Sequence, residues 1–148
     1  MRIAVLFGGV SEERDVSVAS GAQVVRALTS LGHDVIAVDT ARGALPPAEH
    51  AQLMTTGVAV EPPSAQTLSL VRRNARMLVR EAPELRQADV VFIALHGGSG
   101  EDGTIQALFD LAGIPYTGTG HFGSAYAMDK DVAKRLFRSE EPPTPDWL

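Results

Sequence analysis

The sequence predicts an α/β protein of three layers, in which helices flank a short, mainly parallel sheet. One observation is that residues 90–95 form an almost unbroken apolar run, which stops at His96 and is followed by four glycines within residues 97–103. Such a run is typical of a parallel strand covered on both faces. The other is that residues 3–38 have the pattern of a strand, a helix and a second strand, which requires a right-handed crossover between parallel strands.

The first half of the chain supplies the opening strand–helix–strand unit. Residues 3–7 are apolar and end at a pair of glycines. A helix is expected from about residue 16 to residue 31, with Asp15 as its N-cap and Gly32 at its end, because apolar residues recur there at helical spacing. Residues 35–38 form the second strand.

Residues 41–82 have the least distinct pattern. Prolines and glycines within 41–63 indicate a surface excursion with a short helical turn near residues 49–54. Residues 64–82 have the spacing of a helix with one apolar face. Its other face carries arginines at positions 72, 73, 76 and 80, which could bind phosphate, but a solvated surface is the favoured interpretation because charge runs usually are one.

The remainder of the chain is expected to form a central strand at 90–95, a helix at 105–112 that Gly113 ends, a short strand within 113–118 and a helical region at 124–139. Residues 142–148 then contain three prolines, which are typical of a semi-rigid spacer. We therefore assign residues 1–141 to one domain and residues 142–148 to the start of a linker.

Composition excludes several classes of function. Lys+Arg 13 against Asp+Glu 18 gives a net charge of −5, which argues against a broad nucleic-acid surface. The absence of cysteine excludes disulfides, thiol nucleophiles and cysteine-based metal sites, and no His-Glu-His metal spacing occurs. No apolar run approaches the roughly 20 residues of a membrane span, and no cleavable signal opens the chain. A cytoplasmic protein without membrane association is expected.

The glycine-rich loop after residue 95 is the candidate ligand site. In an open α/β sheet, ligands bind at the carboxyl ends of the strands, where His96 should lie. Gly97 and Gly98 allow a ligand to approach the main chain, and the loop leads into a helix N-terminus that favours an anion. Local chemistry therefore predicts an anion-binding α/β domain.

The other polar residues are ambiguous one by one. Glu12, Glu13 and Asp15 could be solvated loop charges, His96 could be a hydrogen-bonded histidine at a strand end, and Lys130 could be a surface lysine. Residues 118–123 match the dinucleotide fingerprint G-x-G-x-x-G, but no acid follows in a suitable place, so a tight strand-to-helix turn is the favoured interpretation.

Four motifs, in order along the chain, closely resemble the D-alanine–D-alanine ligase family. They are residues 7–17, 94–106, 115–120 and 127–130, and the similarity is weakest between about 41 and 87. The resemblance implies a Rossmann-like, pre-ATP-grasp domain, which is the N-terminal substrate-binding domain of a cytoplasmic ligase. That ligase makes D-alanyl-D-alanine for peptidoglycan, and hence for cell-wall biogenesis and cell shape, through an acyl phosphate formed from ATP.

The resemblance also implies roles for individual residues. Glu13 matches the glutamate that orients the ammonium of the first D-alanine, and counting back from the Asp-Val-Ser match favours it over Glu12. His96, with Gly97 and Gly98 beside it, matches the histidine near that substrate's carboxylate and the developing phosphate. Lys130 matches the lysine that reaches the phosphates of ATP.

The resemblance covers only the family's first domain. The ATP-grasp module with its Mg²⁺ ligands would lie beyond Leu148, so no metal ligand is assigned here and the isolated chain is predicted to be inactive. A homodimer is expected, since such domains lie at the subunit interface in the family. Two alternatives remain: a non-catalytic small-molecule-binding or dimerisation module, and a nucleotide-dependent enzyme that uses the 118–123 turn.

Overall fold

A four-stranded sheet in the order β3-β2-β1-β4 forms the centre of the computed structural model, which describes residues 1–53, 63–66, 68–69, 82–140, 142–143 and 145–146. The strands are β1 (Arg2–Phe7), β2 (Asp34–Asp39), β3 (Gly43–Ala44) and β4 (Val90–Ile93). β1 pairs in parallel with β2 and β4, whereas β3 is antiparallel to β2. The expected α/β class with a mainly parallel sheet is confirmed.

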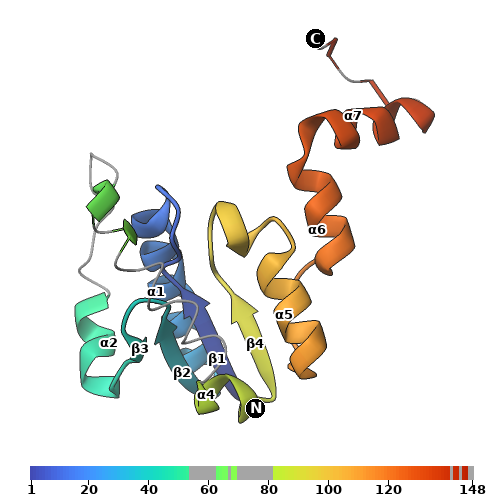
Figure 1. The fold of residues 1–148 in the computed structure, drawn as a ribbon. Coiled ribbons are helices and arrows are strands. Elements are labelled where there is room, and N and C mark those ends of the chain that lie inside the picture. The colour runs from blue at the N-terminus through green and yellow to red at the C-terminus, as the bar shows by residue number, and fades with distance from the viewer. Residues whose placement is uncertain (54–62, 67, 70–81, 141, 144, 147–148) are drawn as a thin grey trace.

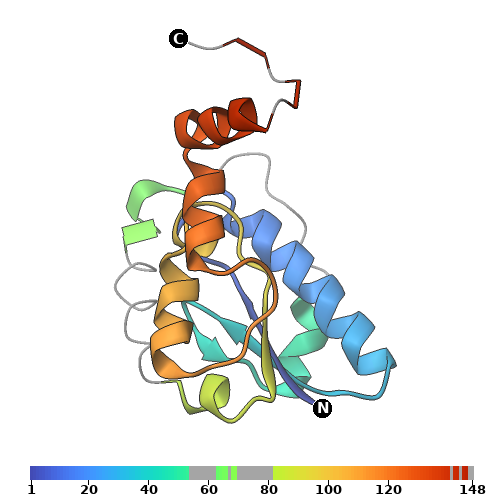
Figure 2. The same cartoon turned by 90° about the vertical axis from the view of Figure 1, so that its right-hand side faces the viewer.

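Helices cover both faces of this sheet, which gives the three expected layers (Figures 1 and 2). One face carries α1, and the other carries α4 and α5. The helical elements are α1 (Arg14–Ser30), α2 (Pro47–Leu53), α4 (Pro83–Arg86), the 3₁₀ turn η1 (Gly98–Gly100), α5 (Thr104–Ala112), α6 (His121–Met128) and α7 (Lys130–Ser139). α7 contains no buried residue and projects beyond the strand ends.

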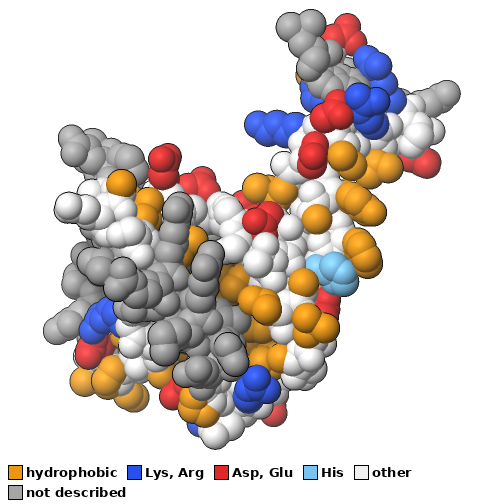
Figure 3. Space-filling model, in the orientation of Figure 1, with side chains coloured by type: hydrophobic (Ala, Val, Ile, Leu, Met, Phe, Trp, Pro, Cys, Tyr) orange, Lys and Arg blue, Asp and Glu red, His pale blue; other side chains and the backbone are white. Residues whose placement is uncertain are grey.

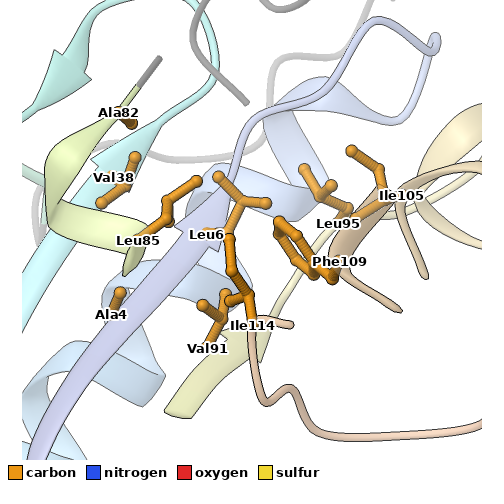
Figure 4. Packing of buried hydrophobic residues seen from close by; sticks show 10 residues of the cluster. All are labelled: Ala4, Leu6, Val38, Ala82, Leu85, Val91, Leu95, Ile105, Phe109 and Ile114. Atoms are coloured by element: carbon orange, nitrogen blue, oxygen red, sulfur yellow. The ribbon is translucent and has the colours of Figure 1, made fainter. Parts of the chain in front are cut away.

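Alternation along β1 divides the core into two clusters. Ile3, Val5 and Phe7 pack on the α1 side, while Ala4 and Leu6 pack on the α5 side. This is the two-residue period of a strand with both faces buried. Figure 4 shows the second cluster, where side chains from β1, β2, β4, α4 and α5 meet.

Gly21 brings α1 unusually close to β1. A Cβ atom at this position would lie 2.6 Å from Cβ and Cγ of Phe7, which is fully buried. Gly21→Ala should therefore lower the free energy of unfolding by about 1–3 kcal/mol through overpacking, although alanine is the better helix former. Urea unfolding followed by circular dichroism tests this. Gln23→Ala, on the exposed face of α1, should change the free energy of unfolding by less than about 0.5 kcal/mol. Equal effects of Gly21→Ala and Gln23→Ala would contradict the prediction.

The prediction of a central strand at 90–95 was wrong in two respects. β4 ends at Ile93, and β1 is the strand with a full neighbour on each side. Among the described residues, the outer edge of β4 is met by one isolated bridge between Val91 and Tyr116, in place of the strand expected within 113–118. Pro115 explains the short pairing, because it accepts a hydrogen bond from Val91 but has no N–H to donate.

Helix boundaries agree with the sequence at several ends and differ at others. α2 confirms the helical turn expected near 49–54, and Gly32 and Gly113, both with positive φ, follow α1 and α5 as expected. Glu13, not Asp15, is the N-cap of α1, because the first helical hydrogen bond runs from Ser17 N to Glu13 O.

The expected helix at 124–139 is in fact two helices. Asp129 interrupts it, and its carboxylate accepts hydrogen bonds from the backbone N–H groups of Asp131 and Val132 at 3.0 Å. Aspartate favours this capping role over a position inside a helix. Most of the helix expected at 64–82, including its four arginines, lies outside the described residues.

Candidate functional site

The loop between β1 and α1 is held by side chains from neighbouring elements. Gly8 and Gly9 both have positive φ, +95° and +83°, which other residues rarely adopt. The N–H of Gly8 donates to Ser17 Oγ at 2.8 Å, and the N–H of Gly9 donates to Thr40 Oγ1 at 2.8 Å. The start of α1 and the end of β2 therefore fix this loop from two sides.

A buried ion pair completes this support. Nη2 of Arg14 donates to both carboxylate oxygens of Asp39, at 2.9 and 2.8 Å. The side chains are only 13% and 6% exposed. The parallel register places Asp39 directly beside Phe7, at the end of β1, which brings its carboxylate within reach of the first turn of α1.

Two serines join this loop to the segment that follows β4. Ser17 Oγ donates to the carbonyl oxygen of Ala94 at 2.6 Å, and Ser11 Oγ donates to that of His96 at 2.5 Å. Ser11 Oγ also accepts from the N–H of Glu13 at 3.2 Å. Segments 85 residues apart in sequence thus lie side by side.

Glu13 and the glycine loop are in close contact. A Cβ atom built on Gly97 would lie 2.7 Å from Oε2 of Glu13 and 3.0 Å from Cβ of Ser11. Gly97 has φ +67°, so glycine is favoured there both for backbone conformation and for space. The carboxylate of residue 13 and the loop that follows residue 96 therefore lie at the same end of the sheet.

His96 lies between two further polar side chains. Its Nε2 is 3.1 Å from Ser20 Oγ, and its Nδ1 is 3.9 Å from Glu101 Oε1. The side chain is 37% exposed, so the imidazole is held by these neighbours but is still partly accessible to solvent. The sequence alone did not single out Ser17 and Ser20 as part of the site. Their i, i+3 spacing at the start of α1 could have indicated them, because it places both on the face of the helix toward the strand ends.

The remaining predicted site residues are placed differently. Gly98, with φ +50°, begins η1, and its carbonyl oxygen accepts from the N–H groups of Glu101 and Asp102 at 3.0 Å. Lys130 is exposed at the first position of α7, the helix that projects beyond the strand ends (Figure 1). The structure therefore brings Glu13, His96, Gly97 and Gly98 together, and Lys130 stands apart from them.

Helices α5 and α6 are joined by a second polar cluster. Asp110 accepts hydrogen bonds from Tyr116 Oη at 2.9 Å and from His121 Nδ1 at 2.7 Å. Both bonds lower the pKa of Asp110, and the bond from His121 has the larger effect. Burial has the largest effect on Tyr116 and raises its pKa, and the Asp110 carboxylate raises it further. At the other end of α5, a side chain at Gly103 would collide with the carbonyl oxygen of His121, so the two helices meet there through backbone.

Apolar side chains are exposed along α5 and α6. They gather over these helices in Figure 3 and include Leu108, Leu111, Phe122, Tyr126 and Met128. Among the described helices, none has the length and apolarity that crossing a membrane requires. Within the same part of the chain, no three histidine, aspartate or glutamate side chains are grouped so that they could hold a metal ion.

The fold and these loops define the class of protein: an open, Rossmann-like α/β domain whose candidate small-ligand site lies at the carboxyl ends of its parallel strands. The Glu13 carboxylate lies beside Gly97 at this site, and His96 precedes Gly97 in the chain. Residues 2–119 match the family model described as D-ala D-ala ligase N-terminus. The chain belongs to this family.

Curated relatives and solved structures agree with this assignment. D-alanine–D-alanine ligases from Magnetococcus marinus and Geobacter sulfurreducens are 41% and 43% identical over 99% and 92% of this chain. The chain spans only 36% and 32% of their lengths. The Coxiella burnetii ligase has a TM-score of 0.69 at 26% identity, and the Bacillus anthracis ligase complexed with ATP has 0.65 at 28%. Both comparisons cover 100% of this chain, and 44% and 40% of the solved chains.

Proposed function

We propose that this chain is the domain that binds the first D-alanine in an ATP-dependent ligase, which joins two D-alanines through an acyl phosphate. The observation that carries the proposal is the contact between the Glu13 carboxylate and Gly97, next to His96. This contact supports the proposal, because a group suited to an ammonium then lies close to one suited to a carboxylate. The ligases named above, similar to this chain along 92% of its length or more, support the choice of substrate.

Each group has a distinct task in this proposal. Glu13 binds the ammonium of D-alanine through charge-assisted hydrogen bonds, which leaves the substrate carboxylate free to react. His96, held by Ser20, hydrogen-bonds that carboxylate and the charge that develops when it is phosphorylated. The N–H groups of Gly97 and Gly98 add donors for the oxyanion of the tetrahedral intermediate.

ATP is the second small molecule of the proposed reaction. Lys130 binds its phosphates as a compact positive charge, which requires that α7 lie against the nucleotide. Residues 1–141 are proposed as the substrate-binding domain, and residues 142–148 as the start of the linker to an ATP-grasp domain. Because the described residues form no carboxylate cluster suited to Mg²⁺, no step is assigned to a metal held by this chain.

The proposed setting is peptidoglycan synthesis in the cytoplasm by a homodimeric enzyme. The chain alone carries part of one substrate site and one phosphate contact, so it should not turn over. A coupled assay with the isolated chain, D-alanine, ATP and Mg²⁺ should detect no D-alanine-dependent ADP formation. ADP formation by the isolated chain would contradict the proposal that catalysis needs groups from an ATP-grasp domain as well.

Titration of the isotope-labelled chain with D-alanine tests the substrate site directly. NMR amide shifts should be saturable and centred on residues 11–13 and 96–98. Glu13→Gln should weaken binding by about 10-fold or more, because a charge-assisted hydrogen bond to the ammonium is lost.

The matched control for this titration is Glu12→Gln, which changes the neighbouring exposed glutamate and should leave the D-alanine affinity within about 2-fold. Equal losses in the two variants, or shifts that avoid both loops, would overturn the assignment of Glu13.

A further inference from the structure

A pocket lies beside the end of β4, on the face of the sheet opposite α1. It has a volume of about 320 Å³ and lies between the end of β4, the glycine loop and α6. This volume is within the lower range of small-molecule sites. The pocket adjoins the D-alanine site, since Glu101 belongs to its wall and is also the carboxylate near His96.

The walls of this pocket combine apolar surface with acceptors. Ile93, Leu95, Ala127 and Met128 supply the apolar part. Among the described residues that line it, none carries a positive charge, and Glu101, with a side chain 41% exposed, supplies a negative one. The pocket therefore disfavours anions and favours a ligand with a positive charge.

Gln106 supplies a second, independent feature. It lines the pocket, is only 5% exposed, and donates from Nε2 to the carbonyl oxygen of Gly100 at 2.9 Å. Its other amide atom, Oε1, is buried without a hydrogen-bond partner. Buried acceptors are almost always paired, so an unpaired one in a pocket wall indicates a place for a donor.

We propose that this pocket binds a small primary amine, in its ammonium form, with a compact apolar body. An ammonium has three N–H donors, enough to pair with the Glu101 carboxylate and, once the buried Gln106 amide turns toward the pocket, with its unpaired oxygen as well. The apolar body then rests on Ile93 and Met128. The proposal does not depend on the ligase function: D-alanine should shift residues around Glu13, whereas the amine should shift residues around Gln106.

Titration of the labelled 148-residue chain with isobutylammonium tests this proposal. Saturable shifts are expected for the side-chain amide of Gln106 and the backbone amides of Gly118 and Ser124, with a Kd of about 1–10 mM for so small a ligand. Isobutyrate, which has a similar body and the opposite charge, should cause none. Absence of saturation by the amine, or equal binding of the anion, would overturn the proposal.

Two variants locate the site. Glu101→Gln should weaken amine binding by about 10-fold, because the charge-assisted bond is lost. Ala127→Leu should abolish binding by filling the pocket, and an unchanged far-ultraviolet spectrum would verify the fold. The matched control is Glu84→Gln in α4, a carboxylate outside the pocket, which should leave the affinity unchanged. Unchanged affinity in Glu101→Gln would refute the assignment.

Discussion

Replacing Asp39 by alanine should lower the free energy of unfolding by about 3–5 kcal/mol, the largest electrostatic effect expected among the described residues. The reason is the guanidinium left behind: the Arg14 side chain is only 13% exposed and would lose both of its short bonds to the carboxylate. The bond from the N–H of Ala41 to Asp39 Oδ1, at 2.7 Å, would be lost as well. Urea unfolding of the whole chain measures the difference.

Strand β2 provides a matched control for this prediction. Asp34, on the same strand, forms a 3.6 Å pair with Arg2, but the two side chains are 72% and 44% exposed. Asp34→Ala should therefore cost less than about 0.5 kcal/mol, since water screens such pairs. The double variant Arg14→Met/Asp39→Leu should recover part of the loss, because no charge is left buried. Equal losses of unfolding free energy for Asp34→Ala and Asp39→Ala would show that burial of the Arg14–Asp39 pair does not affect stability.

Replacing Phe109 by alanine should cost about 3–5 kcal/mol by leaving a cavity in the second core cluster. Phe109 is fully buried and lies among Leu6, Leu95 and Ile105 (Figure 4). Its ring also contacts that of Tyr116, with centroids 5.8 Å apart. Thermal and urea unfolding of the variant should both show the loss.

Leu111, two residues further along α5, is the control for the Phe109 variant. It is 88% exposed, so Leu111→Ala removes almost no buried surface and should change stability by less than about 0.5 kcal/mol. A loss at Leu111 as large as that at Phe109 would mean that the exposed face of α5 is covered in solution. Analytical ultracentrifugation of the same samples would show whether self-association of the chain covers this face.

The strands and most helices could be predicted because their signals are local. Apolar runs identify β1 and β4, helical spacing identifies α1 and α5, and glycines with positive φ identify their ends. The break between α6 and α7 at Asp129 was not predicted, because an aspartate within an apparently continuous helical pattern is also compatible with a surface position on one helix. The lost strand at Tyr116 depends on how Pro115 meets β4, which is a tertiary property.

The candidate site was predictable only in part for a related reason. Loop position and resemblance predict Glu13 and His96 as site residues, whereas the serine bonds that hold their loops depend on the parallel register of β1 with β2 and β4. The bond from Ser11 to His96 spans 85 residues, and no local pattern announces a contact of that range. The same holds for Arg14 and Asp39, which are 25 residues apart.

The missing side chain at Gly103 has a mechanical consequence. Because the main chains of α5 and α6 meet there without an intervening side chain, no soft layer between them can absorb a shift. Close-packed backbone is nearly incompressible, so a push on the first turn of α6 is passed to the start of α5 and hence to the glycine loop before it. The first turn of α6 and the glycine loop that carries His96 are thus linked through a rigid backbone contact.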